Sequence, residues 1–589
     1  MNKDRDFGQR LAPEKTEQGD GRAGNRDKHE RDKRDERDKQ EGLGKSVGLV
    51  MLLSTVARIL SLSGSILYTT HFGYTLETDI YSYAVNLPNL IFTCLGTALV
   101  TVVIPIFAGR LAAGEKKSAY EFIDSILTIA LVLAGLISLL GIMFSPAIVR
   151  LVGRFDAGDR SLAIFALRLM FPIMVFHAVN YAFQGVLQTN KRFVMPAIVS
   201  AFSGLSVILY VLLLADRFGI RGLLAATFCG LMLQALVLIP PVRNIGYRYH
   251  IKMDLRNSDV RLAGRLAIPV LVSSSSYQFN MFINSTFAAA FIGGVITITN
   301  MQTLAFTAAQ LFILSTLAVY FPKMSAQYAI EDYTGYRKTF SDVMRLIIFF
   351  AVPASAGLAF LSQDLIRLLY GRGRVTEADL AVSAAVFSLY ALAIASIGFK
   401  EAADRAFYAM RDSKTPAAVG MLIMVVNITL SFVLKSFLGL IGLAAAYLIS
   451  ITGGALILLY VLKKREREQK PGQGLEQHQG LEQKQGEESE QQQGQEKGLE
   501  RERKKVWQGG MVSLLLKCFL SCAGMLAALL AADRLLSGIW AARAGLGSFV
   551  HIVVLTLLGV TVYFVLTILL KVEEAEKIKK MLLHALNRR

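Results

Sequence analysis

The chain has 589 residues, of which 53% are hydrophobic, and its mean hydropathy is +0.45. Repeated apolar runs of about 20 residues match the thickness of the hydrocarbon core of a bilayer, so these features exclude a soluble globular protein. The formal net charge is +18. The basic excess lies in short loops between apolar runs, which argues against nucleic acid as a partner and for a role in membrane topology.

The segment before the first apolar run, residues 1–45, mixes Lys, Arg, Asp and Glu with nearly balanced signs. Such a polyampholyte cannot bury a core, and we predict a disordered cytoplasmic tail. No signal peptide precedes the first apolar run, which is therefore expected to act as the membrane signal. The cysteines are expected to be packing residues, because they all fall inside apolar runs: Cys94, Cys229, Cys518 and Cys522.

The apolar runs predict fourteen membrane-spanning helices. Their approximate ranges are 47–70, 80–107, 121–145, 161–188, 194–215, 221–242, 264–292, 296–322, 343–361, 379–408, 415–436, 440–462, 510–533 and 548–570. We expect an all-α integral membrane protein built from a charged tail (1–45), an N-terminal six-helix lobe (46–243), a C-terminal six-helix lobe (244–463), a low-complexity Gln-rich cytoplasmic linker (464–509), two further helices (510–571) and an amphipathic C-terminal helix on the inner membrane surface (572–589).

One stretch of the chain occurs twice. Pro105 and Pro322 are 217 residues apart, and each begins a polar loop and an apolar run that closes on Ser-x4-Arg-Leu, at Ser145–Leu151 and at Ser362–Leu368. This pattern indicates a duplication. Because each half holds an even number of spans, both copies insert in the same sense, as in secondary transporters whose substrate route runs between the lobes at mid-membrane.

The distribution of Lys and Arg predicts the orientation. These residues are enriched in the loops after the even-numbered spans, whereas the loops after spans 1 and 7 hold none. Both termini are therefore expected in the cytoplasm. The chain contains no Walker loop, HExxH, GxSxG or clustered histidines, so we predict a transporter rather than an enzyme, with no catalytic residues, cofactor or metal site.

The first two spans carry five candidate residues. Arg58, midway along span 1, either binds an anionic substrate group or forms a structural ion pair or snorkels. Asp79 either caps the start of span 2 or pairs with a cavity arginine. Pro88 is expected to kink span 2 for gating, and Asn86 and Asn89 beside it would satisfy freed carbonyls or line a cavity.

Further polar residues lie inside later spans. His177, Asn180 and Gln184 share one stripe of span 4, which is either a polar seam between helices or a cavity wall. Asn280 in span 7 and Asn300 in span 8 are further candidates for substrate contact, although small polar residues also let helices pack closely.

Four charged residues end span 10. The spacing of Lys400 with Asp404 and of Glu401 with Arg405 predicts two ion pairs, one helical turn apart within each pair. The pairs are either structural or an inner gate that breaks during transport. No carboxylate stands alone in a predicted span, as a simple proton relay would require.

The segment Arg405–Pro416, with the sequence RAFYAMRDSKTP, resembles the MurJ (MviN) lipid II flippases, as do residues 87–90 (LPNL), 78–79 (TD) and 321–325 (FPKMS). The similarity covers about residues 46–463. It implies two six-helix lobes around a central cavity, as in MATE exporters and polysaccharide flippases. The implied activity is transfer of undecaprenyl-pyrophosphate-linked peptidoglycan precursor from the inner to the outer leaflet of the bacterial cytoplasmic membrane by alternating access.

The resemblance further implies a tail groove at spans 13 and 14, and membrane lipids and cell-wall synthesis proteins as partners beside the lipid-linked glycan. Arg58 matches a cavity arginine of the family and Asp79 its outer-loop aspartate. Other cationic positions of the family fall on Gly64, on residues 91–93 and near Thr303. The alternatives are therefore a flippase for another lipid-linked polysaccharide of the sporulation type, a MATE-like cation-coupled exporter, or a membrane scaffold.

Overall fold

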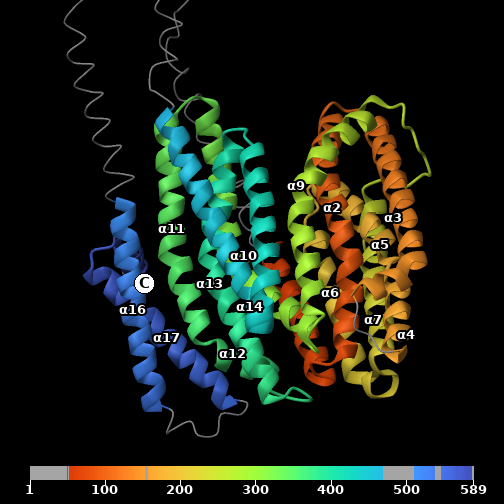
Figure 1. The fold of residues 1–589 in the computed structure, drawn as a ribbon. Helices are drawn as coiled ribbons and strands as arrows, with labels where there is room; N and C mark the ends of the chain where they lie inside the picture. Colours follow the sequence, from red (N-terminus) through yellow and green to blue (C-terminus); the bar gives the residue numbers. More distant parts are fainter. Residues whose placement is uncertain (1–48, 51, 153–156, 469–509, 537–545, 587–589) are drawn as a thin grey trace, which may run out of the picture.

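The computed structural model describes residues 49–50, 52–152, 157–468, 510–536 and 546–586. Within these residues all regular structure is helical (Figure 1). The predicted charged tail lies outside the described residues. So does the predicted linker, apart from residues 464–468, which continue the preceding helix instead.

The helices form two lobes and a C-terminal addition. The first helix covers Leu52–Phe72. The rest of the first lobe is α2 (Leu76–Ala112), α3 (Lys116–Val152), α4 (Ala157–Met170), α5 (Ile173–Thr189), α6 (Val194–Leu213), α7 (Ala215–Val237) and α8 (Ile239–Asn244). The second lobe is α9 (Ser258–Ala288), α10 (Gly294–Ala329), α11 (Tyr333–Phe360), α12 (Ser362–Tyr370), α13 (Glu377–Ala409) and α14 (Lys414–Glu468), and it is followed by α16 (Gly510–Leu536), α17 (Leu546–Leu569) and α18 (Glu573–Leu586).

Ten helices of the described part are long and apolar enough to cross a membrane. One of them, Lys414–Arg465, contains predicted spans 11 and 12, which meet at Gly439 (φ 58°, ψ −134°). A similar backbone conformation at Gly219 (φ 55°, ψ −149°) interrupts α7, and only glycine adopts it without strain. Predicted spans 2, 7 and 8 fall in the long helices α2, α9 and α10.

The boundaries of the helices repeat along the chain. Helices α2 and α10 end at Ala112 and Ala329, and α3 and α11 begin at Lys116 and Tyr333. Each pair of boundaries has the separation of 217 residues found between the two proline motifs. The prediction of an all-α membrane protein with two parallel six-helix lobes and two added helices is therefore confirmed.

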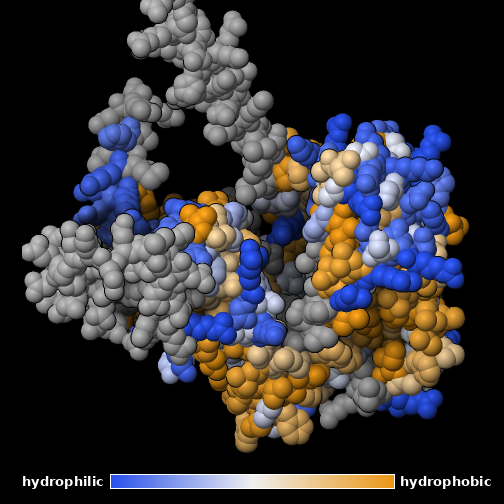
Figure 2. Space-filling model, turned by 90° about the horizontal axis from the view of Figure 1, so that it is seen from above, coloured by the Kyte–Doolittle hydropathy of each residue, from blue (hydrophilic) through white to orange (hydrophobic). Residues whose placement is uncertain are grey.

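The two lobes lie side by side, and α9 packs against α2 of the first lobe and against α14 of the second (Figure 1). Helices α16 and α17 lie outside the second lobe, next to α11. Figure 2 looks down on the end of the bundle at which α10 ends and α11 begins, and a hollow separates the lobes there. We call this space the interlobe hollow.

The first helix is held against α6 by small residues. A Cβ atom added at Gly204 would lie 2.8 Å from the backbone nitrogen and Cα of Ser61. The hydroxyl of Ser61 donates to the carbonyl of Ser200 at 3.2 Å. Close backbone approach of this kind is how helices associate in a bilayer, where apolar burial gives no net driving force.

We therefore predict that Gly204→Ala lowers the stability of the protein. Forcing a methyl group against the Ser61 backbone should cost about 1–3 kcal/mol. The measurement is the thermal unfolding midpoint of the purified protein in detergent. Gly135→Ala is the matched control, because a Cβ atom there has no neighbour within 4 Å; equal midpoints for the two variants would contradict the prediction.

Candidate functional site between the two lobes

At the end of the bundle where the first helix stops, buried polar groups join the lobes. Asp79 Oδ1 accepts a hydrogen bond from the backbone N–H of Ile296, in the first turn of α10, at 3.0 Å. The hydroxyl of Ser65 donates to Asn300 Oδ1 at 2.8 Å, and Asn300 Nδ2 donates to Thr69 Oγ1 at 2.9 Å. Asp79 and Asn300 are both buried. We call this set of contacts the outer closure.

A backbone contact extends the outer closure to the loop after α12. The N–H of Arg374 donates to the carbonyl of Thr70 at 2.9 Å. A Cβ atom added at Gly373 would lie 2.0 Å from that same carbonyl oxygen. The second lobe therefore touches the end of the first helix with backbone as well as side chains.

Asp79 does not cap its own helix, so the interpretation that it caps span 2 is wrong. Thr75 is the N-cap of α2, with an extended backbone (φ −113°, ψ 166°), and it forms a capping box with Thr78. That places Asp79 one turn into the helix, where its carboxylate reaches across to the N–H of Ile296. The partial positive charge at the N-terminus of α10 favours a carboxylate there.

Contacts between α2 and α10 weaken away from the outer closure. Asn86 Nδ2 lies 3.4 Å from Thr299 Oγ1, which is near the limit of a hydrogen bond. Asn89, one turn further along α2, and Thr303, one turn further along α10, are exposed. Pro88 is buried, and α2 continues through it without interruption. The lobes thus separate progressively toward the interlobe hollow.

Arg58 lies on the side of the first helix that faces this space. It precedes Ser65 by seven residues, which is two helical turns, so the two side chains share one face about 10 Å apart along the axis. Ser65 contacts α10, whereas Arg58 is exposed. Arg58 therefore lies on the face of the first helix that contacts α10 through Ser65, inward of the outer closure.

Asn280 lies in a polar seam between α9 and α14 rather than in the hollow. Its amide Oδ1 accepts from Asn284 at 3.0 Å, and its Nδ2 donates to Asn427 Oδ1 at 2.9 Å. The hydroxyl of Ser431 donates to Asn284 at 3.0 Å. Buried amides that satisfy one another in this way hold helices together.

The polar stripe of span 4 is also a seam. Asn180 Nδ2 donates to Gln234 of α7 at 3.0 Å, and Gln184 Nε2 donates to Asn180 at 2.6 Å. His177 stacks on Phe92 of α2, with ring centroids 6.0 Å apart. Of the two readings of this stripe, the seam between helices is therefore the correct one for Asn180, whereas Gln184 bonds to Asn180 within α5.

One of the two predicted ion pairs at the end of α13 is formed. Lys400 Nζ lies 2.5 Å from Asp404 Oδ2, and Asp404 is buried. The guanidinium of Arg405 lies over the ring of Phe321, 5.4 Å from its centroid, and Glu401 on the same helix is half-buried. Arg405 thus links α13 to α10 through a cation–π contact.

Sequence reasoning missed Ser65 and Thr69 of the outer closure, and Thr299 next to it. The signal that could have found two of them is their spacing, because Arg58, Ser65 and Thr69 recur at seven and four residues along one helical face.

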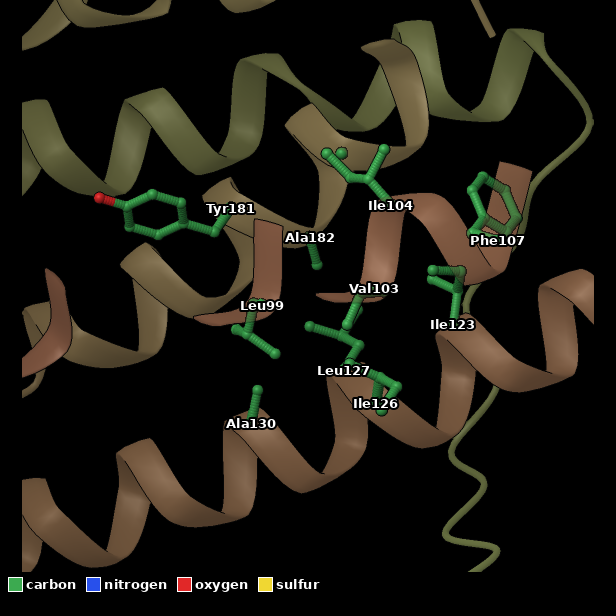
Figure 3. A pocket seen from close by; sticks show the side chains of 11 residues that line it. Leu99, Val103, Ile104, Phe107, Ile123, Ile126, Leu127, Ala130, Tyr181 and Ala182 are labelled. Carbon is green, nitrogen blue, oxygen red and sulfur yellow. The ribbon is translucent and has the colours of Figure 1, made fainter. Parts of the chain in front are cut away.

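A separate pocket lies inside the first lobe, among α2, α3 and α5 (Figure 3). Its lining carries no charged side chain, and the hydroxyl of Tyr181 is its only side-chain polar group, so it does not suit a phosphate-bearing ligand. The lining residues are Leu99, Val103, Ile104, Phe107, Ile123, Ile126, Leu127, Ala130, Tyr181, Ala182 and Gly185.

Comparisons with known proteins agree with this architecture. Relatives in Treponema pallidum and Bdellovibrio bacteriovorus, both described as "Probable lipid II flippase MurJ", are 26% identical to the chain over 418 and 434 residues. The first alignment covers 69% of the chain and 79% of the relative, and the second covers 71% and 82%.

Solved structures show the same fold. A structure of "Lipid II flippase MurJ, inward closed conformation" matches with a TM-score of 0.70 at 20% identity, covering 89% of this chain and 99% of that one. An inward-facing MATE multidrug transporter matches with a TM-score of 0.61 at 14% identity, covering 70% and 95%. The family model described as "Lipid II flippase MurJ" matches residues 68–478, which is more than half of the chain. The chain therefore belongs to the MurJ lipid II flippase family.

Proposed function

We propose that the chain moves lipid II, an undecaprenyl-pyrophosphate-linked peptidoglycan precursor, from the inner to the outer leaflet of the bacterial cytoplasmic membrane by alternating access. Family membership supports this activity, because the relatives in two bacteria carry that description. The observation that carries the mechanism is the asymmetry between the lobes. Asp79 and Asn300 bond α10 to α2 and to the first helix at one end. At the other end a hollow lies between the lobes (Figure 2), and the Arg110–Asp259 pair joins α2 to α9 beside it.

The interlobe hollow suits a lipid that has a charged headgroup and a long apolar tail. Moving a pyrophosphate through hydrocarbon would expose unpaired charge at a prohibitive cost. A polar space between the lobes avoids this cost while the lipid tail stays in the bilayer. Arg58 is the proposed headgroup contact, since a planar guanidinium group can donate two parallel hydrogen bonds to a phosphate.

Gly64 and Thr303 stand at positions where the resemblance places a cation. Binding of the headgroup would therefore depend more strongly on Arg58 in this chain. At Gly64, an added Cβ atom would lie 3.2 Å from the carbonyl oxygen of Gly204, so the packing of the first helix on α6 excludes a long side chain. Thr303 occupies another of these positions, and it is exposed on α10 beside the hollow. A cationic side chain would fit there, whereas threonine contributes only a hydroxyl.

The outer closure is suited to opening and closing. It consists of a few hydrogen bonds, each of which contributes about 0.5–1.5 kcal/mol net. Binding of a charged headgroup can offset a cost of this size. In the proposed cycle, Asp79 and Asn300 release α10 and the first helix, and the inner ends of the lobes then approach. Pro88 and the cluster Lys400–Arg405 are the proposed gating elements on the inner side.

We further propose that both termini and the interlobe hollow face the cytoplasm. Basic residues support this orientation, because they concentrate in the loops at the open end, where Arg110 pairs with Asp259 and Lys252 with Glu121. The lobes divide near residue 243, and α9 begins the second lobe although its first turn is bonded to the end of α2.

The first prediction concerns Arg58. Arg58→Ala should reduce lipid II exposure at the outer leaflet by about tenfold or more, because a hydrogen bond to a charged group contributes about 1.5–3 kcal/mol. The measurement is rescue of a conditional flippase-depletion strain together with labelling of exposed lipid II. Arg58→Lys should retain part of the activity. Arg221→Ala, which removes an exposed arginine of α7, is the control. Full activity of Arg58→Ala at normal protein level would exclude this role.

The second prediction concerns the outer closure. In a variant whose four cysteines are replaced by serine, Thr303→Cys should react rapidly with a water-soluble maleimide, whereas Asn300→Cys, buried one turn away on the same helix, should be protected. Adding Asp79→Ala removes the acceptor of the Ile296 N–H and should increase labelling at position 300. Equal labelling of Thr303→Cys and Asn300→Cys in the absence of Asp79→Ala would contradict an outer closure that buries position 300.

The third prediction concerns orientation. Ile292 and Ile330 flank the two ends of α10 and are 76% and 75% exposed. A membrane-impermeant maleimide should label Ile292→Cys in intact cells lacking an outer-membrane barrier. It should label Ile330→Cys only after the cells are opened. The reverse pattern would show that the termini lie outside the cytoplasm.

A further inference from the structure

A cluster of three metal-ligating side chains lies at the closed end of the bundle, away from the interlobe hollow. Asp364 of α12, Asp533 of α16 and His551 of α17 each present one ligand atom, and these atoms lie within 4.8 Å of one another. His551 Nε2 and Asp533 Oδ1 are 3.3 Å apart. The side chain of His551 is 1% exposed and that of Asp533 is 34% exposed. The imidazole is therefore fixed by packing, while the carboxylate side remains open to solvent.

The composition of the cluster and the distance from His551 to Asp533 suit a transition-metal cation. Zinc binds imidazole nitrogen and carboxylate oxygen at about 2.0–2.2 Å, so neighbouring ligands of a tetrahedral site lie about 3.3–3.5 Å apart. The distance from His551 to Asp533 has this value. Two carboxylates held close together repel each other, and a divalent cation between them would remove that repulsion. The imidazole favours zinc over magnesium or calcium.

We propose that Asp364, Asp533 and His551 bind a divalent cation of the zinc class and that this cation fastens α16 and α17 to the second lobe. Three protein ligands leave one position for water. The inference concerns attachment of the added helices and does not depend on which lipid is transported. No metal site was expected from the sequence, because the three ligands are separated by many residues in the chain.

The position of the cluster explains what the cation would contribute. At the opposite end, the added helices are already attached to α11. Arg345 pairs with Glu573 at 2.8 Å and with Glu574 at 3.3 Å, and the hydroxyl of Tyr563 donates to the carbonyl of Phe349 at 2.9 Å. The proposed site supplies the corresponding attachment at the closed end, where α12 meets α17. The pair of helices would then be held at two levels.

A second histidine–carboxylate contact provides a matched control. His71 Nε2 lies 3.5 Å from Asp216 Oδ1, at the same end of the bundle, and Asp216 is 99% exposed. This pair does not belong to the three-ligand cluster. Because this pair lacks a third ligand, it tests whether a histidine–aspartate pair alone is enough to bind zinc.

The test is zinc binding to the full-length protein, purified without a polyhistidine tag, treated with a chelator and placed in lipid nanodiscs. Isothermal titration with zinc chloride should give one site per chain, and magnesium chloride should give none at the same concentration. Asp533→Asn and His551→Gln should weaken zinc binding at least tenfold, whereas His71→Gln should leave it unchanged. X-ray absorption of the zinc-loaded protein should show one imidazole among oxygen ligands.

The proposal is overturned if the wild-type protein binds no zinc, or if Asp533→Asn binds zinc as tightly as the wild type. It is also overturned if His71→Gln loses as much binding as His551→Gln. Should the buried His551→Gln variant fail to fold, Asp364→Asn decides the question, because Asp364 is only half-buried. A second readout is the thermal unfolding midpoint, which zinc should raise in the wild type and in His71→Gln but not in Asp364→Asn.

Discussion

The hydrogen bond from the Ile296 N–H to the Asp79 carboxylate is the contact on which this state of the protein depends. It joins the first turn of α10 in one lobe to α2 in the other, at equivalent positions of the two repeats. Asn300 adds two bonds to the first helix beside it. These bonds hold α10 to α2 and to the first helix at one end. At the other end the Arg110–Asp259 pair joins α2 to α9, and a hollow lies between the lobes (Figure 2). Arg58, Asn89 and Thr303 are exposed.

Polar side chains inside the membrane serve two different purposes in this fold. Within each lobe they satisfy one another, as Asn180 does with Gln234 and Asn280 with Asn427. The bonds of such a seam hold the helices of a lobe together. Between the lobes the polar groups are less fully paired. Only these groups can exchange partners as the lobes move, which is the requirement for alternating access.

The departures from the family pattern also have physical reasons. A glycine at position 64 lets the first helix approach α6, and Gly204 on the facing helix lies against the backbone of Ser61. Close packing therefore occupies a position at which the resemblance places a cation. Arg58 stands on the first helix, which contacts α6 of the first lobe and α10 of the second. The helices added at the C-terminus take no part in the interlobe hollow, and they are attached to the second lobe at its outer surface.

The sequence by itself determined the membrane-spanning helices, their duplication and the family. Bilayer thickness fixes the length of each apolar run, and the separation of 217 residues between Pro105 and Pro322 reappears in the ends of α2 and α10. It also identified Arg58 and Asp79 as noteworthy, because charge inside an apolar span is costly. Only the tertiary structure decided that Asp79 binds α10, that Asn280 belongs to a seam, and that Asp364, Asp533 and His551 converge. Hydrophobic periodicity specifies which face of a helix is buried, but partners distant in the chain are chosen by how the helices pack.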